Sequence, residues 1–319
     1  MKTLGSLIRL AVEVRRLENG AAALVTSPLS RAFTESLSQL TSSEETLTTG
    51  HALRFLNGFN AQTGEAIRGA SASATSQAIE IASYQSERTA KILSTATGNV
   101  FTADGVGRDR LREILTHDAI EGRTADQWWR RLESQTKLKT QRLLDEGLTK
   151  GLSADEIKQQ INELVVRPAM RQAEALTRTV ASNLGTAAQF ETAEANPHLT
   201  RGYRLLFTFD RRTSLICLAW SRKSKDKIYP YAPDSPRPPM HWNCRTLIQP
   251  VLIGREDETQ IEAGDWLTKQ PEKTQDAILG PRRAEMFRKG RLQLDELIRS
   301  DNSIATLAEV RGVAATFTL

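Results

Sequence analysis

The sequence lacks any hydrophobic run long enough to cross a membrane. No stretch reaches the roughly 18 to 20 consecutive apolar residues that a transmembrane helix needs. The apolar residues near the N-terminus are soon interrupted by charged ones at Arg9, Glu13, Arg15 and Arg16. We therefore expect no membrane partner and no secretion signal. Cysteine is also scarce: two cysteines in 319 residues do not make a disulfide framework, which favours a reducing compartment such as the cytoplasm.

Proline is missing from one long stretch and crowded into a short one. None occurs between Pro28 and Pro168, so this region is able to form long helices. Apolar residues recur there at helical spacing, and we expect several helices between about Thr34 and Gly98. A later stretch is too rich in proline to be helical, with Pro230, Pro233, Pro236, Pro238, Pro239 and Pro250 close together.

Two helix starts carry the spacing of a capping box. In this motif a hydroxyl group and a carboxyl or amide group three residues later each bind a backbone N–H group at the helix start. The two matches are Thr124 with Gln127 and Ser153 with Glu156. A third helix is expected after Pro168, where apolar residues are spaced by three or four. These features predict a helical bundle over residues 124–195.

The hydrophobic period changes after Pro197. Alternation with an aromatic face predicts a strand over residues 203–209. A second short strand is expected over residues 246–253, where Pro250 restricts it to an edge or a bulge. Helical character returns from Arg282 to Ile298. The fold class is therefore α+β, a mainly helical N-terminal region followed by a small mixed α/β C-terminal domain.

The net charge of +5 is concentrated in one segment. From Leu199 to Arg255 there are eleven basic and three acidic residues, a net of +8, so the rest of the chain sums to −3. Such a segment is either a solvated loop surface or a contact for a phosphate backbone. The candidate residues for binding DNA or a partner are Arg211, Arg212, Arg222, Lys223, Lys225, Lys227 and Arg245.

Two short motifs in this segment carry residues that could bind a metal ion. The predicted strand runs into Asp210-Arg-Arg-Thr-Ser214 and then Cys217, and the proline-rich stretch ends in Pro238-Pro-Met-His-Trp-Asn-Cys-Arg245. Thiolates and imidazoles are the ligands that Zn²⁺ prefers, so Cys217, His241 and Cys244 are candidate zinc ligands. A closed structural site needs four ligands, and the fourth would have to be His198, Asp210 or water.

The same residues allow other interpretations. Cys217 and Cys244 could form a disulfide or lie together as reduced thiols, and every alternative brings the two sulfurs close enough to pin the loop to the strand. Asp210 is expected to cap the next helix, while Arg211 and Arg212 are candidates for contacts with phosphate or with an acidic surface. The prolines stiffen the loop, which suits recognition.

With both motifs present in this order, the sequence resembles the Mu F-like phage head morphogenesis family of minor head or minor capsid proteins. In that family a strand ending in Asp-x-Arg-Thr-Ser precedes a cysteine, and a later loop reads roughly Pro-Pro-x-His-x-Asn-Cys-Arg-Cys. The matching positions are Asp210, Thr213, Ser214, Cys217, Pro238, Pro239, His241, Asn243 and Cys244.

Other segments are similar to the family on both sides of these motifs. They are residues 151–157 and 177–186 upstream and residues 279–292 downstream, so the resemblance covers about Trp128 to Glu309. The chain departs from the family pattern at Val180, where the family usually has Glu, and at Thr246, where it has the last Cys.

The resemblance implies a domain organisation. It makes residues 124–319 a Mu F-like domain. Residues 1–123 lie outside the resemblance, and their position and composition alone suggest a helical N-terminal region used in docking or assembly. Within the Mu F-like domain we expect helices over 124–195, the small sheet and proline-rich loop over 200–255, and C-terminal helices over 256–319.

The resemblance also implies a function. It predicts a minor head protein of a tailed bacteriophage that binds the portal protein during procapsid assembly, with the scaffold or the major capsid protein as further candidate partners. Such a protein would contact double-stranded DNA non-specifically during packaging and ejection. It would be in the host cytoplasm during assembly and then in the virion, inside the capsid near the portal vertex.

Catalytic motifs are not found in the sequence. It has no phosphate-binding P-loop and no Gly-x-Ser-x-Gly elbow. His241 beside Asn243 resembles an HNH-type nuclease only in part, since no second catalytic histidine lies at a suitable distance. We therefore expect no enzyme and no cofactor other than the zinc considered above. The alternatives are a non-specific DNA-binding protein that acts outside the capsid and a metal-dependent nuclease or toxin.

Overall fold

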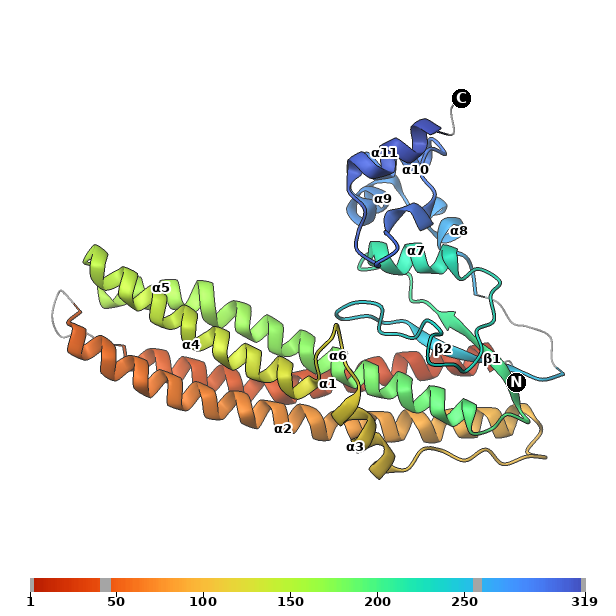
Figure 1. Cartoon of the computed structure of the whole chain (residues 1–319), viewed down its shortest axis with the longest axis horizontal. Coiled ribbons are helices and arrows are strands. Elements are labelled where there is room, and N and C mark those ends of the chain that lie inside the picture. Colours follow the sequence, from red (N-terminus) through yellow and green to blue (C-terminus); the bar gives the residue numbers. More distant parts are fainter. Residues whose placement is uncertain (1–2, 41–46, 255–259, 317–319) are drawn as a thin grey trace. The chain divides into compact units, whose positions relative to one another are not determined.

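The structure is a computed structural model that describes residues 3–40, 47–254 and 260–316 (Figure 1). Over these residues the chain is mostly helical, with a two-stranded antiparallel sheet, which places it in the α+β class. Two compact units are distinguished by their internal contacts. We call residues 12–86 and 106–188 the helical unit, and residues 1–11, 87–105 and 189–319 the motif unit. No helix in the described part of the chain has the length and apolar character needed to span a membrane.

The helical unit is built from long helices, some of which continue into the motif unit. In chain order it contains most of α1 (Thr3–Ser38) and of α2 (Thr49–Ala96), then α3 (Arg108–His117), α4 (Ala125–Lys150), α5 (Ala154–Ile161), the π-helical turn η1 (Asn162–Val166) and most of α6 (Arg167–Glu194).

Helix α2 differs from the prediction. Several helices were expected between Thr34 and Gly98, but the described residues hold only the end of α1 and one helix of 48 residues. The expectation was wrong because the small residues of this stretch do not interrupt the helix. Buried alanines recur every four residues at Ala70, Ala74 and Ala78, so small side chains form a narrow buried stripe along one face of α2.

The predicted helix starts are confirmed. Thr124 with Gln127 and Ser153 with Glu156 each form a complete capping box at the start of α4 and α5. The third start is less simple, because α6 begins at Arg167 and continues directly from η1. The π turn precedes Pro168, which has no N–H to donate, so the helical run passes the proline without ending.

Aromatic and polar contacts join α1 to α2 within the helical unit. The Phe33 and Phe59 rings have their centroids 6.1 Å apart, and Phe55 lies 5.5 Å from Phe59. Further along the pair, the Tyr84 hydroxyl donates to the Glu13 carboxylate at 2.7 Å. Because Phe33 meets Phe59 while Glu13 meets Tyr84, the two helices run antiparallel.

The motif unit adds the sheet and a set of short helices. The two strands β1 (Thr200–Leu206) and β2 (Leu247–Leu252) are separated in the chain by α7 (Leu215–Lys223) and the proline-rich loop. The C-terminal part holds α8 (Ala263–Thr268), α9 (Glu272–Leu279), α10 (Pro281–Arg288), the 3₁₀ turn η2 (Leu294–Leu297) and α11 (Leu307–Thr316). These short helices share a buried cluster with α7 through residues that include Leu218, Leu267, Leu279 and Leu297.

Strand β1 ends three residues before the predicted position. The backbone N–H of Phe207 donates to the side-chain oxygen of Gln260 at 2.7 Å, and the Gln260 amide donates to the Phe207 carbonyl. A side chain thus takes the backbone groups that a longer strand would have used.

Pro250 lies inside β2, opposite Tyr203. The backbone N–H and carbonyl of Tyr203 both bond to Tyr229, at 2.9 and 2.8 Å, so they are directed away from Pro250. The missing N–H of Pro250 therefore leaves no bond unmade, which agrees with the expectation of an edge position.

Candidate metal centre

Helix α7 positions the first half of the motif. Ser214 is its N-cap, and its hydroxyl accepts a hydrogen bond from the backbone N–H of Cys217 at 3.1 Å. This capping contact fixes the start of α7, so Cys217 lies in the first turn of the helix with its side chain buried. The expectation that Asp210 caps this helix is therefore wrong, because Ser214 takes that position.

The second half of the motif is a tight loop that precedes β2. Pro238 is buried, and its bond to Pro239 is a cis peptide. Asn243 has a φ of 58°, a left-handed conformation that asparagine tolerates better than most residues. The backbone N–H of Cys244 donates to the carbonyl of His241 at 3.1 Å, so this turn brings the two side chains to one side of the loop.

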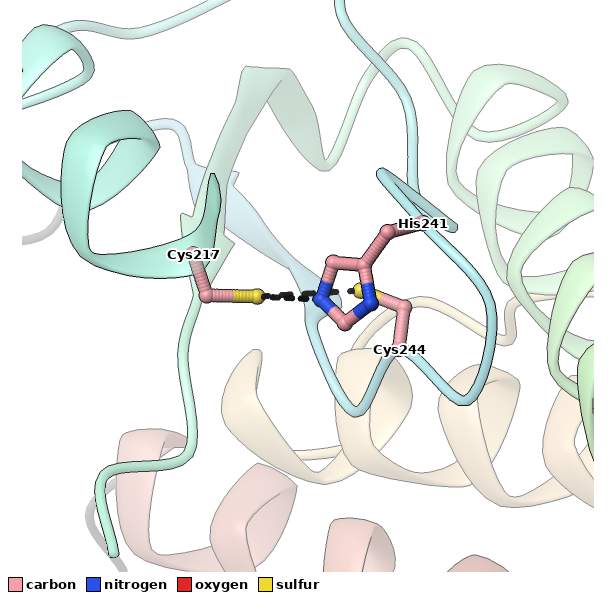
Figure 2. A group of neighbouring side chains, drawn as sticks. All are labelled: Cys217, His241 and Cys244. Carbon is pink, nitrogen blue, oxygen red and sulfur yellow. Dashed lines mark hydrogen bonds between the residues drawn. The ribbon is translucent and has the colours of Figure 1, made fainter. Parts of the chain in front are cut away.

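The two halves meet in a cluster of three side chains. Figure 2 shows Cys217 on α7 pointing toward His241 and Cys244 on the loop. The Sγ of Cys217 lies 3.0 Å from Nε2 of His241 and 3.9 Å from Sγ of Cys244 (Figure 2). All three potential ligand atoms lie within 4.8 Å of one another. The structure thus brings together the three residues predicted from the sequence.

Two hydroxyl groups lie beside this cluster. Ser214 Oγ lies 2.8 Å from Nε2 of His241, and Thr246 Oγ1 lies 3.5 Å from the Cys217 sulfur. The other ring nitrogen of His241, Nδ1, lies 2.7 Å from the carbonyl oxygen of Trp242. Since a carbonyl only accepts, Nδ1 carries the hydrogen of this bond, and in the neutral ring Nε2 then presents its lone pair to the sulfurs.

The two thiols have different proton affinities. The hydrogen bond between them, together with burial, raises the pKa of Cys217, while the bond donated by Cys217 and the neighbouring His241 lower the pKa of Cys244. For His241, burial lowers the pKa, but the interaction with Cys244 outweighs it and the net shift is upward. The cluster therefore favours a thiolate at one sulfur and a proton retained on the other.

No disulfide joins Cys217 and Cys244. Their separation of 3.9 Å far exceeds the roughly 2.05 Å of a disulfide bond. The prediction that the sulfurs lie close together is confirmed, but Cys217 belongs to α7, so the loop is held to a helix rather than to the strand. The two protein side chains considered as a fourth ligand make other contacts. His198 packs edge-on against Phe101, and Asp210 accepts hydrogen bonds from Arg245.

An ion pair forms a second link between the motif halves. Arg245 donates two hydrogen bonds to Asp210, at 2.5 and 2.7 Å, and only 14% of the Arg245 side chain is exposed. The bond from Arg245 holds the pKa of Asp210 below its usual value. Asp210 also accepts from the backbone N–H of Arg212 at 2.7 Å, which makes a local turn. Arg245 is thus an internal contact and is not available as a DNA contact.

Glu262 binds two further candidate cations. Arg222 and Lys225 form ion pairs with its two carboxylate oxygens at 2.9 and 2.8 Å, although Glu262 lies outside the basic segment. Lys223 lies over the ring of Trp220, with 5.9 Å between its nitrogen and the ring centroid. The formal charge of +8 therefore overstates the positive potential of this surface.

Other predicted binding residues remain at the surface. Arg211, Arg212 and Lys227 are exposed. Arg212 lies 3.9 Å from Asp210 but keeps 82% of its side chain exposed. Thr213 is buried and donates to the carbonyl of Thr208, so it has a structural position. Arg255, the last basic residue of the segment, lies outside the described residues.

Sequence reasoning missed Glu262 and Gln260. Their partners are 37 to 53 residues away in the chain, and neither residue lies in a recognisable motif. No local pattern pointed to them. Thr246 was noted only as a departure from a family pattern, whereas the structure places its hydroxyl in the cluster.

Comparison with known proteins identifies no relative: no family model, curated protein or solved structure matches this chain.

Proposed function

We propose that this chain is a minor head protein of a tailed bacteriophage, of the Mu F-like head morphogenesis type. It binds the portal during procapsid assembly and contacts packaged double-stranded DNA, without catalysing a reaction. One observation carries the proposal: the two motifs behind the family resemblance form a single bonded unit. Asp210 pairs with Arg245, Ser214 with His241, and Cys217 with Cys244, across 27 to 35 residues of chain.

These contacts favour a binding role. The polar groups of the motifs bond to one another and hold the loop that joins α7 to β2 in one shape. Tyr203 adds to this by donating from its hydroxyl to the carbonyl of Pro236 at 2.9 Å. A loop that is already ordered loses little conformational entropy when a partner binds, which suits docking on a portal subunit. The scaffold and the major capsid protein remain further candidate partners.

The first test is co-purification with the portal subunit encoded in the same genome. We expect a complex of defined stoichiometry by native mass spectrometry. The variant Asp210→Asn, which breaks the pair with Arg245, should weaken the complex. Asp234→Asn is the matched control, since Asp234 is an exposed acid of the same loop. A chain that forms no complex with the portal, scaffold or major capsid protein would contradict the assembly role.

DNA contact is assigned to the exposed cations Arg211, Arg212 and Lys227 and to the half-buried Lys223, which lies over the ring of Trp220. Each phosphate neutralised contributes about 0.9 to the slope of log affinity against log salt, so replacing all four by Ala should flatten the slope by about 3 to 4. Fluorescence anisotropy with a duplex measures this. The control, Arg222→Gln with Lys225→Gln, removes cations already paired with Glu262 and should change the slope little. An unchanged slope in the quadruple variant would refute the assignment.

The same assays separate the alternative functions. Duplex binding without any head-protein complex would favour a DNA-binding protein that acts outside the capsid. Cleavage of the duplex that requires a divalent metal and disappears in His241→Ala would favour a nuclease and refute the non-enzymatic proposal.

A further inference from the structure

We propose that Cys217, His241 and Cys244 bind one zinc ion through three protein ligands and leave the fourth position to an exchangeable ligand such as water. The proposal does not depend on the phage function. It would make the cluster a metal-held joint between α7 and the loop that leads into β2 (Figure 2).

The distance between the two sulfurs fits a single tetrahedral ion. Two thiolates that each lie about 2.3 Å from zinc at the tetrahedral angle are about 3.8 Å apart. The sulfurs of Cys217 and Cys244 are 3.9 Å apart. Nε2 of His241 lies 3.0 Å from the Cys217 sulfur, somewhat closer than the roughly 3.5 Å expected around zinc. The ion therefore requires the ring to move by about half an ångström while the sulfurs stay in place.

The histidine is already oriented as a ligand. Its Nδ1 group donates to the carbonyl of Trp242, and this contact leaves Nε2 as the coordinating atom. Metal-binding histidines commonly donate their second ring N–H to a carbonyl or carboxylate in this way, which fixes both the tautomer and the ring direction.

The charges and burial also suit zinc. Two thiolates neutralise Zn²⁺, so the bound centre carries no net charge in a place where Cys244 is fully buried. Among the described residues, no carboxylate belongs to this group, and the nearby Asp210 is held by Arg245. Soft sulfur ligands with one imidazole favour zinc over magnesium or calcium.

The fourth position is the distinctive part of the proposal. The groups beside the cluster include the hydroxyls of Ser214 and Thr246, which are poor zinc ligands but good hydrogen-bond partners for a bound water. A zinc site with three protein ligands keeps an open position that other small ligands can enter. Thr246 also offers a simple way to close it, because its Oγ1 is only 3.5 Å from the Cys217 sulfur.

The test uses the full chain, stripped of metal by a chelator and titrated with Co²⁺. We expect saturation at one equivalent, with the thiolate charge-transfer and visible bands of a four-coordinate ion, and displacement of Co²⁺ by Zn²⁺. The protein purified without chelator should contain about one zinc by mass spectrometry. A folded wild-type chain that shows no thiolate-to-cobalt band would overturn the proposal, and the cluster would then be a hydrogen-bonded thiol pair.

Variants assign the ligands. Cys217→Ser, Cys244→Ser and His241→Asn should each lower the affinity by more than about 100-fold, beyond the 10- to 100-fold that loss of an outer-shell contact produces. His51→Gln, at an exposed position near the start of α2, is the control and should bind as the wild type does. Equal binding by the three ligand variants and the control would place the metal elsewhere.

A fourth variant tests the open position. In the wild type, added azide should shift the visible cobalt bands because it enters the coordination sphere. Thr246→Cys adds a third thiolate, so it should bind at least about 10-fold more tightly and no longer respond to azide. A wild-type spectrum insensitive to azide, with no gain in Thr246→Cys, would show that a protein atom already fills the fourth position.

Discussion

The helical unit and the motif unit are stabilised in different ways. In the helical unit, apolar side chains along α1, α2, α4 and α6 are buried over many turns. In the motif unit the sheet has only two strands, of seven and six residues, and the loop between them depends on a few specific bonds. The helical unit therefore depends mainly on side-chain volume, and the motif unit on the placement of individual polar and backbone atoms.

The largest loss of stability is expected from opening a cavity in the helical unit. Phe59 on α2 is fully buried against Phe33 and Phe55. Phe59→Ala should lower the free energy of unfolding by about 3 to 5 kcal/mol, measured by urea denaturation. Phe59→Leu keeps most of the volume and should cost about 1.5 kcal/mol or less. Equal losses in both variants would contradict the claim that volume dominates here.

The second-largest loss of stability is expected where two backbone segments of the motif unit approach closely. Gly202 in β1 has a φ of 145°, and an added Cβ would lie 2.5 Å from the carbonyl oxygen of Tyr229. Gly202→Ala should cost about 2 to 3 kcal/mol, because neither backbone segment can move without breaking the Tyr203–Tyr229 bonds.

The control for this change is Gly290→Ala. Gly290 has a φ of 67°, and an added Cβ would meet no atom within 4 Å. The loss should therefore be about 1 kcal/mol, from backbone strain alone. If the two alanine variants lose equal stability, the close approach to Tyr229 is not what constrains β1.

The Asp210–Arg245 pair should give an intermediate effect. Asp210→Asn removes the charge while keeping the shape, and leaves the largely buried Arg245 without its carboxylate. We expect a loss of about 1 to 2 kcal/mol, lower than for a fully buried pair because 38% of the Asp210 side chain is exposed. Asp234→Asn should leave the urea midpoint unchanged. A neutral result for Asp210→Asn would mean that the loop does not depend on this pair.

The smallest expected effect concerns Glu262. Partial burial raises the pKa of Glu262, but hydrogen bonds from Lys225 and Arg222 outweigh it and bring the pKa below its usual value. A lowered pKa contributes stability above the unfolded-state pKa of about 4.3, and this contribution is lost as the pH falls through the folded-state pKa. Glu262→Gln should therefore cost less than about 1 kcal/mol at pH 7, since both cations are partly exposed.

The difference between Glu262→Gln and the wild type should disappear at low pH, where Glu262 is protonated. Urea midpoints at neutral and at strongly acidic pH measure it. Glu35→Gln, at an exposed position on α1, is the control and should show no such change with pH. A difference that persists at low pH would show that the side chain acts by packing rather than by charge.

Local signals in the sequence were sufficient for much of the helical unit. The absence of proline, the helical period and the two capping boxes predicted helices at Thr124 and Ser153, because these signals act over three or four neighbouring residues. The length of α2 was missed, since weak local breaks such as small residues do not end a helix that is supported by packing along its length.

Residue type also identified Cys217, His241 and Cys244 as candidate metal ligands, because it limits which atoms can coordinate a metal, and it left the fourth ligand open among His198, Asp210 and water. Which side chains surround them, and which cations are already paired, follows from long-range contacts in the folded chain. The contacts of Glu262, Gln260 and Thr246 join residues 29 to 53 positions apart. Such pairings depend on how α7, the loop and β2 fold together, and no local pattern in the chain records them.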